Sequence, residues 1–358
     1  MVKMLPLLPI EKELETKEVL KKLTLAHKAL AELKGLVTSI PNENILIETL
    51  TLREAKESSA IENIISTMEE VYQSSLFDNQ FSNANTKEVH QYAAALKKGY
   101  ALVKEKGLLT NNTILQIQQT LEENNAGFRK LPGTKLLNDK TGETIYTPPQ
   151  DYETIITLMQ NLERYINDDI LEDTDPIIKM AVIHHQFESI HPFYDGNGRT
   201  GRIINILYLV HKKLLNLPIL YLSSYIIRNK PAYYKLLQQV RQTQEWEEWI
   251  LYMLTGVEET AIESIALISG IKKLMQEYKI SIRNNLPKLY SQDLINNLFK
   301  YPYTKIEFIE RDLQVSRKTA IRYLEQLQKL GVVKKTKIGR TNFYLNEQLY
   351  KLLSANIG

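Results

Sequence analysis

The chain has 358 residues, of which 43% are hydrophobic and 24% are charged, and its formal net charge at pH 7 is +3. These values are typical of a globular protein with a sizeable core and more than one domain. The sequence contains no run of about 18 apolar residues, the length that would predict a membrane span. The absence of cysteine excludes disulfides and thiolate metal sites and fits a reducing cytoplasm, and residues 1–9 are too weakly patterned for a secretory signal.

Helical periodicity dominates the first 125 residues. It predicts helices over 11–35, 45–59, a stretch that ends at Tyr72, 85–106 and 111–123. Gly35 is a C-cap signal for the first helix, and Asn or Thr near the cap position opens the last two.

Glycine and proline interrupt this pattern over residues 127–150. Two short β-prone runs, 134–137 and 144–147, flank the turn signal of residues 138–142, which predicts a β-hairpin. Helical patterns resume at Tyr152 and continue to about Lys279.

A glycine-containing loop lies between two apolar helices that the pattern predicts to be buried, 175–190 and 203–210. The first begins with Asp175 as N-cap and Pro176 at the first helical position. The loop itself reads His191-Pro192-Phe193-Tyr194-Asp195-Gly196-Asn197-Gly198-Arg199-Thr200-Gly201-Arg202.

The loop contains three glycines, Gly196, Gly198 and Gly201. Each lowers the stability of the fold, because glycine loses more backbone entropy on folding than any other residue. They are useful where backbone N–H groups must approach a ligand closely. Since the loop leads into a helix N-terminus, it predicts an anion site.

The side chains of the loop add the remaining groups for phosphoryl or nucleotidyl transfer. Arg199 and Arg202 can contact phosphate oxygens, Asp195 can hold a divalent cation, and His191 can take a proton from a hydroxyl. Taken singly, each residue is more often an ordinary loop or turn residue. Their occurrence together favours a catalytic site.

The loop resembles the signature of the Fic-domain family, His-Pro-Phe-x-[Asp/Glu]-Gly-Asn-Gly-Arg-x-x-Arg, at every fixed position. The resemblance implies a mainly α fold, an all-helical core with a β-hairpin flap, and transfer of AMP from ATP to a Ser, Thr or Tyr hydroxyl of a target protein. It implies that His191 is the general base and that Asp195 carries Mg²⁺. It assigns nucleotide contacts to Asp195, Gly196, Asn197, Gly198, Arg199, Thr200, Gly201 and Arg202.

A second motif, Ser58-Ser59-Ala60-Ile61-Glu62-Asn63, resembles the family's inhibitory motif, in which Ser58, Glu62 and Asn63 occupy the fixed positions. A Glu62 carboxylate on Arg202 would take the place of the γ-phosphate and hold ATP in a non-reactive pose. The alternative is an ordinary helix end.

Two further segments resemble family features. Thr144, Ile145 and Tyr146 resemble the flap edge that pairs with an extended target segment. Tyr233 and Tyr234 resemble adenine-pocket residues, although core packing is the alternative for them. Arg241 stands where some relatives have asparagine, so this chain departs from those relatives on the adenine side of the site and not on the phosphate side.

The C-terminal segment 288–358 predicts three helices followed by a β pair, the pattern of a small winged helix-turn-helix domain. Residues 311–344 carry nine Lys or Arg and two Asp or Glu, so DNA contact through this range is one reading. Dimerisation or protein contact is the other, and relatives include homodimers.

The predicted domains are an N-terminal helical region (1–110), a catalytic core (111–280, flap 134–149) and the winged helix (288–358). An autoinhibited adenylyltransferase is the favoured function. The alternatives are a DNA-binding regulator with a nucleotide-sensing site and an enzyme that removes AMP from modified protein.

Overall fold

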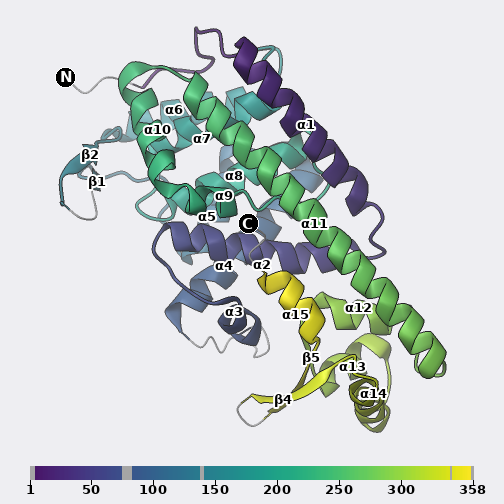
Figure 1. Cartoon of the computed structure of the whole chain (residues 1–358). Coiled ribbons are helices and arrows are strands. Elements are labelled where there is room, and N and C mark those ends of the chain that lie inside the picture. The colour runs from purple at the N-terminus through teal and green to yellow at the C-terminus, as the bar shows by residue number, and fades with distance from the viewer. Residues whose placement is uncertain (1–4, 75–82, 138–140, 339–340, 356–358) are drawn as a thin grey trace.

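A computed structural model describes residues 5–74, 83–137, 141–338 and 341–355 (Figure 1). Helices dominate this part of the chain, as predicted. Those that precede the C-terminal segment are α1 (Lys17–Val37), α2 (Glu43–Ile61), α3 (Met68–Ser74), α4 (Ala84–Lys106), α5 (Asn111–Glu122), α6 (Tyr152–Asn167), α7 (Pro176–Ile190), α8 (Asn197–His211), α9 (Ser223–Arg228), α10 (Lys230–Thr243) and α11 (Glu247–Asn285).

Side-chain caps fix the beginnings of the helices. Asn83 and Thr86 form a capping box at the start of α4, and Thr110 and Asp175 cap α5 and α7. The prediction that Gly35 ends the first helix is wrong, because α1 continues to Val37. Val37 is buried, and tertiary packing of this last turn outweighs the local glycine signal.

The pair α7 and α8 forms the centre of the core. Every residue of α7 from Ile177 to Ile190 is buried, and α8 is buried from Arg199 to Leu209. Helices α4, α5 and α6 pack around this pair, and the long helix α11 packs against α1 along the outside (Figure 1). The loop between α7 and α8 is therefore held by a rigid support on both sides. No helix of the described residues is both long and apolar enough to cross a membrane.

The predicted hairpin is present but short. Strand β1 (Leu136–Leu137) pairs antiparallel with β2 (Thr144–Tyr146), with Leu136 opposite Tyr146. The predicted turn, 138–142, falls partly on residues 138–140, which lie outside the described residues.

The C-terminal segment contains the predicted helices and β pair and two elements that the pattern did not predict. Its elements are α12 (Gln292–Lys300), β3 (Tyr303–Thr304), α13 (Ile306–Leu313), α14 (Arg317–Lys329), β4 (Lys334–Ile338), β5 (Thr341–Leu345) and α15 (Glu347–Ser354). The unpredicted ones are β3, too short for a periodic signal, and α15. The sheet order is β3-β5-β4. Helices α12 and α15 pack against α2 and α11, respectively.

Candidate active site

The chain turns sharply at His191, the C-cap residue that follows α7. His191 has φ 50° and ψ 59°, in the left-handed region, and its N–H donates to the Phe187 carbonyl at 2.9 Å. Gly196 has φ 77° and precedes the first residue of α8. These two left-handed positions bracket the tight loop that connects α7 to α8.

Two of the three loop glycines lie inside α8, which corrects the prediction of a loop through residue 202. The helix starts at Asn197, so Gly198 and Gly201 are helical. A Cβ at Gly198 would collide with Glu62, and a Cβ at Gly201 would lie 2.6 Å from Glu188 Oε1. Because they have no side chain, Gly198 and Gly201 leave room for the side chains of Glu62 and Glu188. Of the three glycines, Gly196 alone needs the backbone freedom of glycine, because its φ is positive.

The loop is fixed from inside by Asn197. Its amide donates to the Phe193 carbonyl at 2.9 Å and accepts from the Phe193 N–H at 2.8 Å. This side chain, expected at the phosphates, is thus engaged with the loop backbone in this structure. The backbone amide of Asn197 is among the first N–H groups of α8, which have no partner within the helix.

Arg129 is a site residue that the sequence reasoning missed. It is fully buried, and its Nε donates to the His191 carbonyl at 2.8 Å. Its Nη2 donates to the Pro149 carbonyl at the base of the hairpin. Arg129 therefore links the hairpin to the His191 loop by hydrogen bonds. These segments are far apart in the sequence, and no local sequence pattern predicts the contact.

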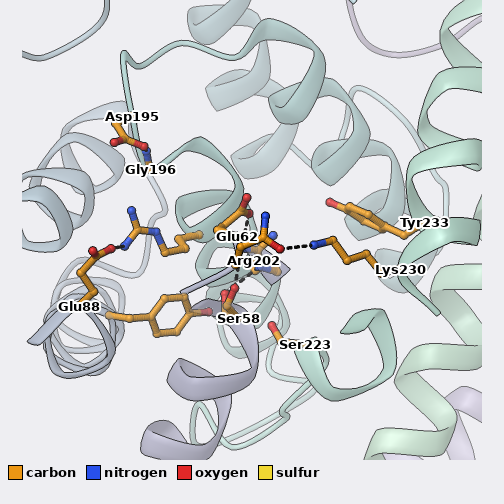
Figure 2. A network of polar contacts seen from close by, with 12 residues as sticks. Ser58, Glu62, Glu88, Asp195, Gly196, Arg202, Ser223, Lys230 and Tyr233 are labelled. Atoms are coloured by element: carbon orange, nitrogen blue, oxygen red, sulfur yellow. Dashed lines mark hydrogen bonds and ion pairs between the residues drawn. The ribbon is translucent and has the colours of Figure 1, made fainter. Parts of the chain in front are cut away.

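The buried Arg202 guanidinium is the centre of a polar network at the N-terminal turns of α8 (Figure 2). Its Nη2 donates to Glu62 Oε1 at 2.7 Å and to the Ser58 carbonyl at 3.0 Å. Its Nε donates to the Ser58 hydroxyl at 2.7 Å. The structure thus brings Ser58 and Glu62 of the predicted inhibitory motif onto Arg202.

Asn63, the third residue of that motif, follows Glu62 at the end of α2. Its side-chain oxygen accepts from Lys230 Nζ at 3.2 Å, which ties this helix end to α10. The Glu62 side chain keeps 35% of its surface exposed, whereas Arg202 keeps 2%. Glu62 can therefore leave without repacking of the core, whereas Arg202 cannot.

Charge pairing governs the protonation of both groups. Burial would raise the pKa of Glu62, but the adjacent Arg202 charge and hydrogen bond lower it overall. Burial would lower the pKa of Arg202, but the Glu62 carboxylate raises it well above its usual value. Both side chains are therefore ionised at neutral pH.

The Arg199 side chain forms ion pairs with two other helices, whereas the sequence predicted that it contacts phosphate. Its Nη1 donates to Glu88 at 2.6 Å and its Nη2 donates to Glu122 at 2.8 Å. The two ion pairs join α8 to α4 and α5 and are mostly buried. In this geometry Arg199 positions the helix.

Asp195 and Thr200 complete the predicted loop residues. Asp195 is exposed, and its Oδ1 accepts from the Gly196 N–H at 2.7 Å. Thr200 is fully buried, and its N–H makes the first intrahelical bond of α8, to the Gly196 carbonyl. The Asp195 side chain thus lies at the surface of the loop, with Oδ1 engaged by the Gly196 N–H, whereas Thr200 belongs to the helix.

The imidazole of His191 is held neutral. Burial, with help from the Arg241 and Arg129 charges, lowers its pKa to about 4. A neutral imidazole at physiological pH is the state that a general base requires.

We expect this state to be visible without substrate. At about pH 5.5, long-range ¹H–¹⁵N spectra should report a neutral His191, because its pKa lies below that pH. His27 is the internal control, because its hydrogen bond to Asp175 raises its pKa and should leave it charged in the same spectrum. A charged His191 at this pH would contradict the electrostatic account.

The predicted adenine-pocket residues differ in exposure. Tyr233 is 2% exposed, and its hydroxyl lies 2.7 Å from His184 Nε2. Its ring lies 5.8 Å from that of Trp249. Tyr234 is 45% exposed, with its ring centroid 5.1 Å from that of Tyr233. Tyr233 thus packs in an aromatic cluster, Tyr234 lies at the surface, and the adenine contact stays a prediction.

The hairpin edge is tied to α10. Gln238 Nε2 donates to the Ile145 carbonyl at 3.2 Å, and the Arg241 guanidinium lies 4.1 Å from the ring centroid of Tyr146. The Tyr146 hydroxyl donates to the Ser189 carbonyl at 2.9 Å. Thr144 pairs with β1, so the Ile145 backbone lies on the outer edge of β2.

Models of three domains match this chain along most of its length. They are "Fic/DOC family N-terminal" (20–101), "Fic/DOC family" (108–209) and "Protein adenylyltransferase SoFic-like, C-terminal domain" (274–349). The chain belongs to the Fic family.

Two named relatives of this Fic protein illustrate the similarity. It is 30% identical to the probable protein adenylyltransferase aq_aa38 of Aquifex aeolicus over 165 residues, 46% of this chain and 45% of that one. It is 43% identical to the protein adenylyltransferase Fic of Drosophila erecta over 47 residues, 13% of this chain and 10% of that one. The chain thus aligns with less than half the length of either relative.

Solved structures share the fold. A Fic family protein from Desulfovibrio desulfuricans G20 aligns with a TM-score of 0.59 at 18% identity, over 95% of this chain and 98% of that one. Fic-1 from C. elegans aligns with a TM-score of 0.54 at 19% identity, over 70% of this chain and 73% of that one. At these identities the likeness supports the fold alone.

Proposed function

We propose that this Fic-family protein transfers AMP from ATP to a Ser, Thr or Tyr hydroxyl of a target protein, either another protein or itself. The observation that carries the proposal is a neutral His191 on the short loop that leads into α8, whose N-terminal turns hold the buried Arg202. A base beside an anion site is the arrangement that hydroxyl attack on phosphorus needs.

The chemistry follows from these groups. The target hydroxyl loses its proton to the imidazole of His191 as its oxygen bonds to the α-phosphorus. The bond from that phosphorus to the bridging oxygen breaks, and pyrophosphate leaves. The first N–H groups of α8 and the Arg202 charge stabilise the negative oxygens.

Asp195 fits the role of a Mg²⁺ ligand. It is exposed at the loop, and the described residues contain no cluster of three or more His, Cys, Asp or Glu that would hold a metal alone. Mg²⁺ is commonly bound by one or two carboxylates together with substrate phosphates. The ion would supply charge neutralisation at those phosphates.

Glu62 restrains the reaction in this proposal. Its carboxylate takes the Arg202 donor at 2.7 Å that a γ-phosphate would use. ATP then competes with an internal anion, and a nucleotide that binds beside Glu62 meets negative charge where its γ-phosphate belongs. Removal of AMP is the second candidate, because a Glu62 carboxylate ordered by Arg202 can serve to orient a water for attack on a modified side chain.

The outer edge of β2 is the proposed docking strand for the target. Ile145 is 45% exposed, and its carbonyl contacts only the flexible Gln238 side chain among the described residues. An extended target segment can displace this side chain and pair with the strand. This pairing would bring its hydroxyl past Tyr146 toward His191.

The C-terminal segment gives little support to the alternative function, a DNA-binding regulator with a nucleotide-sensing site. Part of its basic run is neutralised locally, because Arg311 pairs with Asp312, Arg317 with Glu307, and Lys334 with Glu347. DNA contact through 311–344, and homodimerisation, stay proposals that these contacts do not favour.

Intact mass spectrometry tests the reaction type. After incubation of the Glu62→Gly protein with ATP and Mg²⁺, we expect the mass of one or more AMP groups on the protein. GTP or UTP in place of ATP should give less product. Addition of a phosphate mass alone would reject nucleotidyl transfer in favour of phosphoryl transfer, and loss of a pre-existing AMP mass would favour the removal reaction.

A further inference from the structure

A pocket of about 250 Å³ lies between α2, α3 and the last helix of the C-terminal segment, α15. Arg53 and Lys56 of α2, Met68 of α3, and Tyr350 and Ser354 of α15 contribute to its lining. Helix α15 lies beside α2 in Figure 1. The pocket thus joins the helix that carries Glu62 to the C-terminal segment.

Arg53 is the buried charge of this pocket. It is 6% exposed, its Nη2 donates to the Ala355 carbonyl at 3.2 Å, and its guanidinium stacks 4.7 Å from the ring centroid of Tyr221. Its Nη1 is buried and has no hydrogen-bond partner among the described residues. A buried guanidinium without a counter-charge is costly, so the site calls for an anion.

The carboxylates that line the pocket are already engaged. Glu57 pairs with Lys56 at 2.9 Å, and Glu69 accepts from Gln73 at 2.9 Å. No ion pair between described residues involves Arg53. Among the residues that the structure describes, Arg53 therefore has no direct ion-pair partner, although Glu57 and Glu69 lie in the same lining.

Two hydroxyls add to the unmet hydrogen bonds around Arg53. Ser354 Oγ, in the pocket lining, is buried without a partner among the described residues, and so is Tyr72 Oη. The Tyr72 ring lies 6.4 Å from that of Tyr350, another lining residue. A guanidinium N–H with hydroxyl donors matches the oxygens of a phosphate group. Water would satisfy the hydrogen bonds but not the charge.

We propose that this pocket binds a small phosphate-bearing anion, either the free ion or a small phosphate monoester. Bound there, the anion bridges Arg53 of α2 and Ser354 of α15. Arg53 precedes Glu62 by nine residues, about 14 Å along the helix. If the proposed inhibition by Glu62 holds, the anion tethers the inhibitory helix to the C-terminal segment.

Calorimetric titration of the full chain with inorganic phosphate and with ribose 5-phosphate tests the binding and needs no ATP. Phosphate also binds helix N-termini, so the readout is the difference between wild type and Arg53→Gln. We expect the variant to lose one site or to bind there at least about tenfold more weakly. The tighter of the two probes identifies the free ion or the monoester as the preferred form.

Lys351→Gln is the control, because it removes one positive charge from α15 at an exposed position outside this pocket. It should bind as wild type does. Ser354→Ala, which removes one small hydroxyl, should weaken binding severalfold and keeps the test valid if Arg53→Gln fails to fold. Identical isotherms for wild type, Arg53→Gln and Ser354→Ala would overturn the proposal, whatever the outcome for AMP transfer.

Discussion

Glu62→Gly should raise the rate of AMP transfer by at least about tenfold. The substitution removes the acceptor that holds Arg202 at 2.7 Å and leaves the arginine, buried in α8, free for the γ-phosphate. A hydrogen bond to a charged group contributes about 1.5–3 kcal/mol, and 1.4 kcal/mol corresponds to a factor of ten. Initial rates of label transfer from ATP measure the effect.

Glycine also weakens helices, so this prediction needs a matched control. Ala60→Gly places the same residue two positions earlier on α2, at a cost of about 1 kcal/mol to the helix, and keeps the Glu62 contact. It should leave the rate close to that of wild type. Equal activation by both variants would mean that loosening of α2, and not loss of the carboxylate, releases the enzyme.

His191→Ala in the Glu62→Gly background should lower transfer by about 100-fold to 10,000-fold, the usual contribution of a general base. ATP binding should change little, because the phosphates meet the α8 N-terminus and Arg202, neither of which the substitution removes. Rates and ATP affinity, measured on the same preparation, separate the two effects.

The backbone at His191 complicates this variant. With φ at 50°, alanine is strained there, whereas asparagine tolerates the left-handed region. His191→Asn is therefore the better-folded control, and it should lose transfer to the same extent. Retained transfer in His191→Asn would remove His191 from the role of base, and loss of ATP binding would indicate that the loop had collapsed.

Local patterns predicted the position of the loop between the two buried helices α7 and α8. The hydrophobic runs of α7 and α8 and the cap at Asp175 located the loop. The placement of Glu62 on Arg202 followed from the family resemblance.

Contacts between distant segments escaped prediction. Arg129 clasps the hairpin to the loop, and Arg199 pairs with Glu88 and Glu122 on other helices. Gly198 and Gly201 look like loop residues in sequence, yet they lie in α8. Glycine is needed there because Glu62 and Glu188 approach these positions closely. Such constraints arise only from tertiary packing, which spacing along the chain does not encode.

The most direct test of restrained AMP transfer is incorporation of label from α-labelled ATP with Mg²⁺ into protein. Wild type, Glu62→Gly and Glu62→Gly/His191→Asn are compared in one experiment. We predict weak labelling of wild type, strong labelling of Glu62→Gly and none above background in the double variant. Equal labelling of wild type and Glu62→Gly would contradict the restraint, and no labelling of either despite measurable ATP binding would contradict AMP transfer itself.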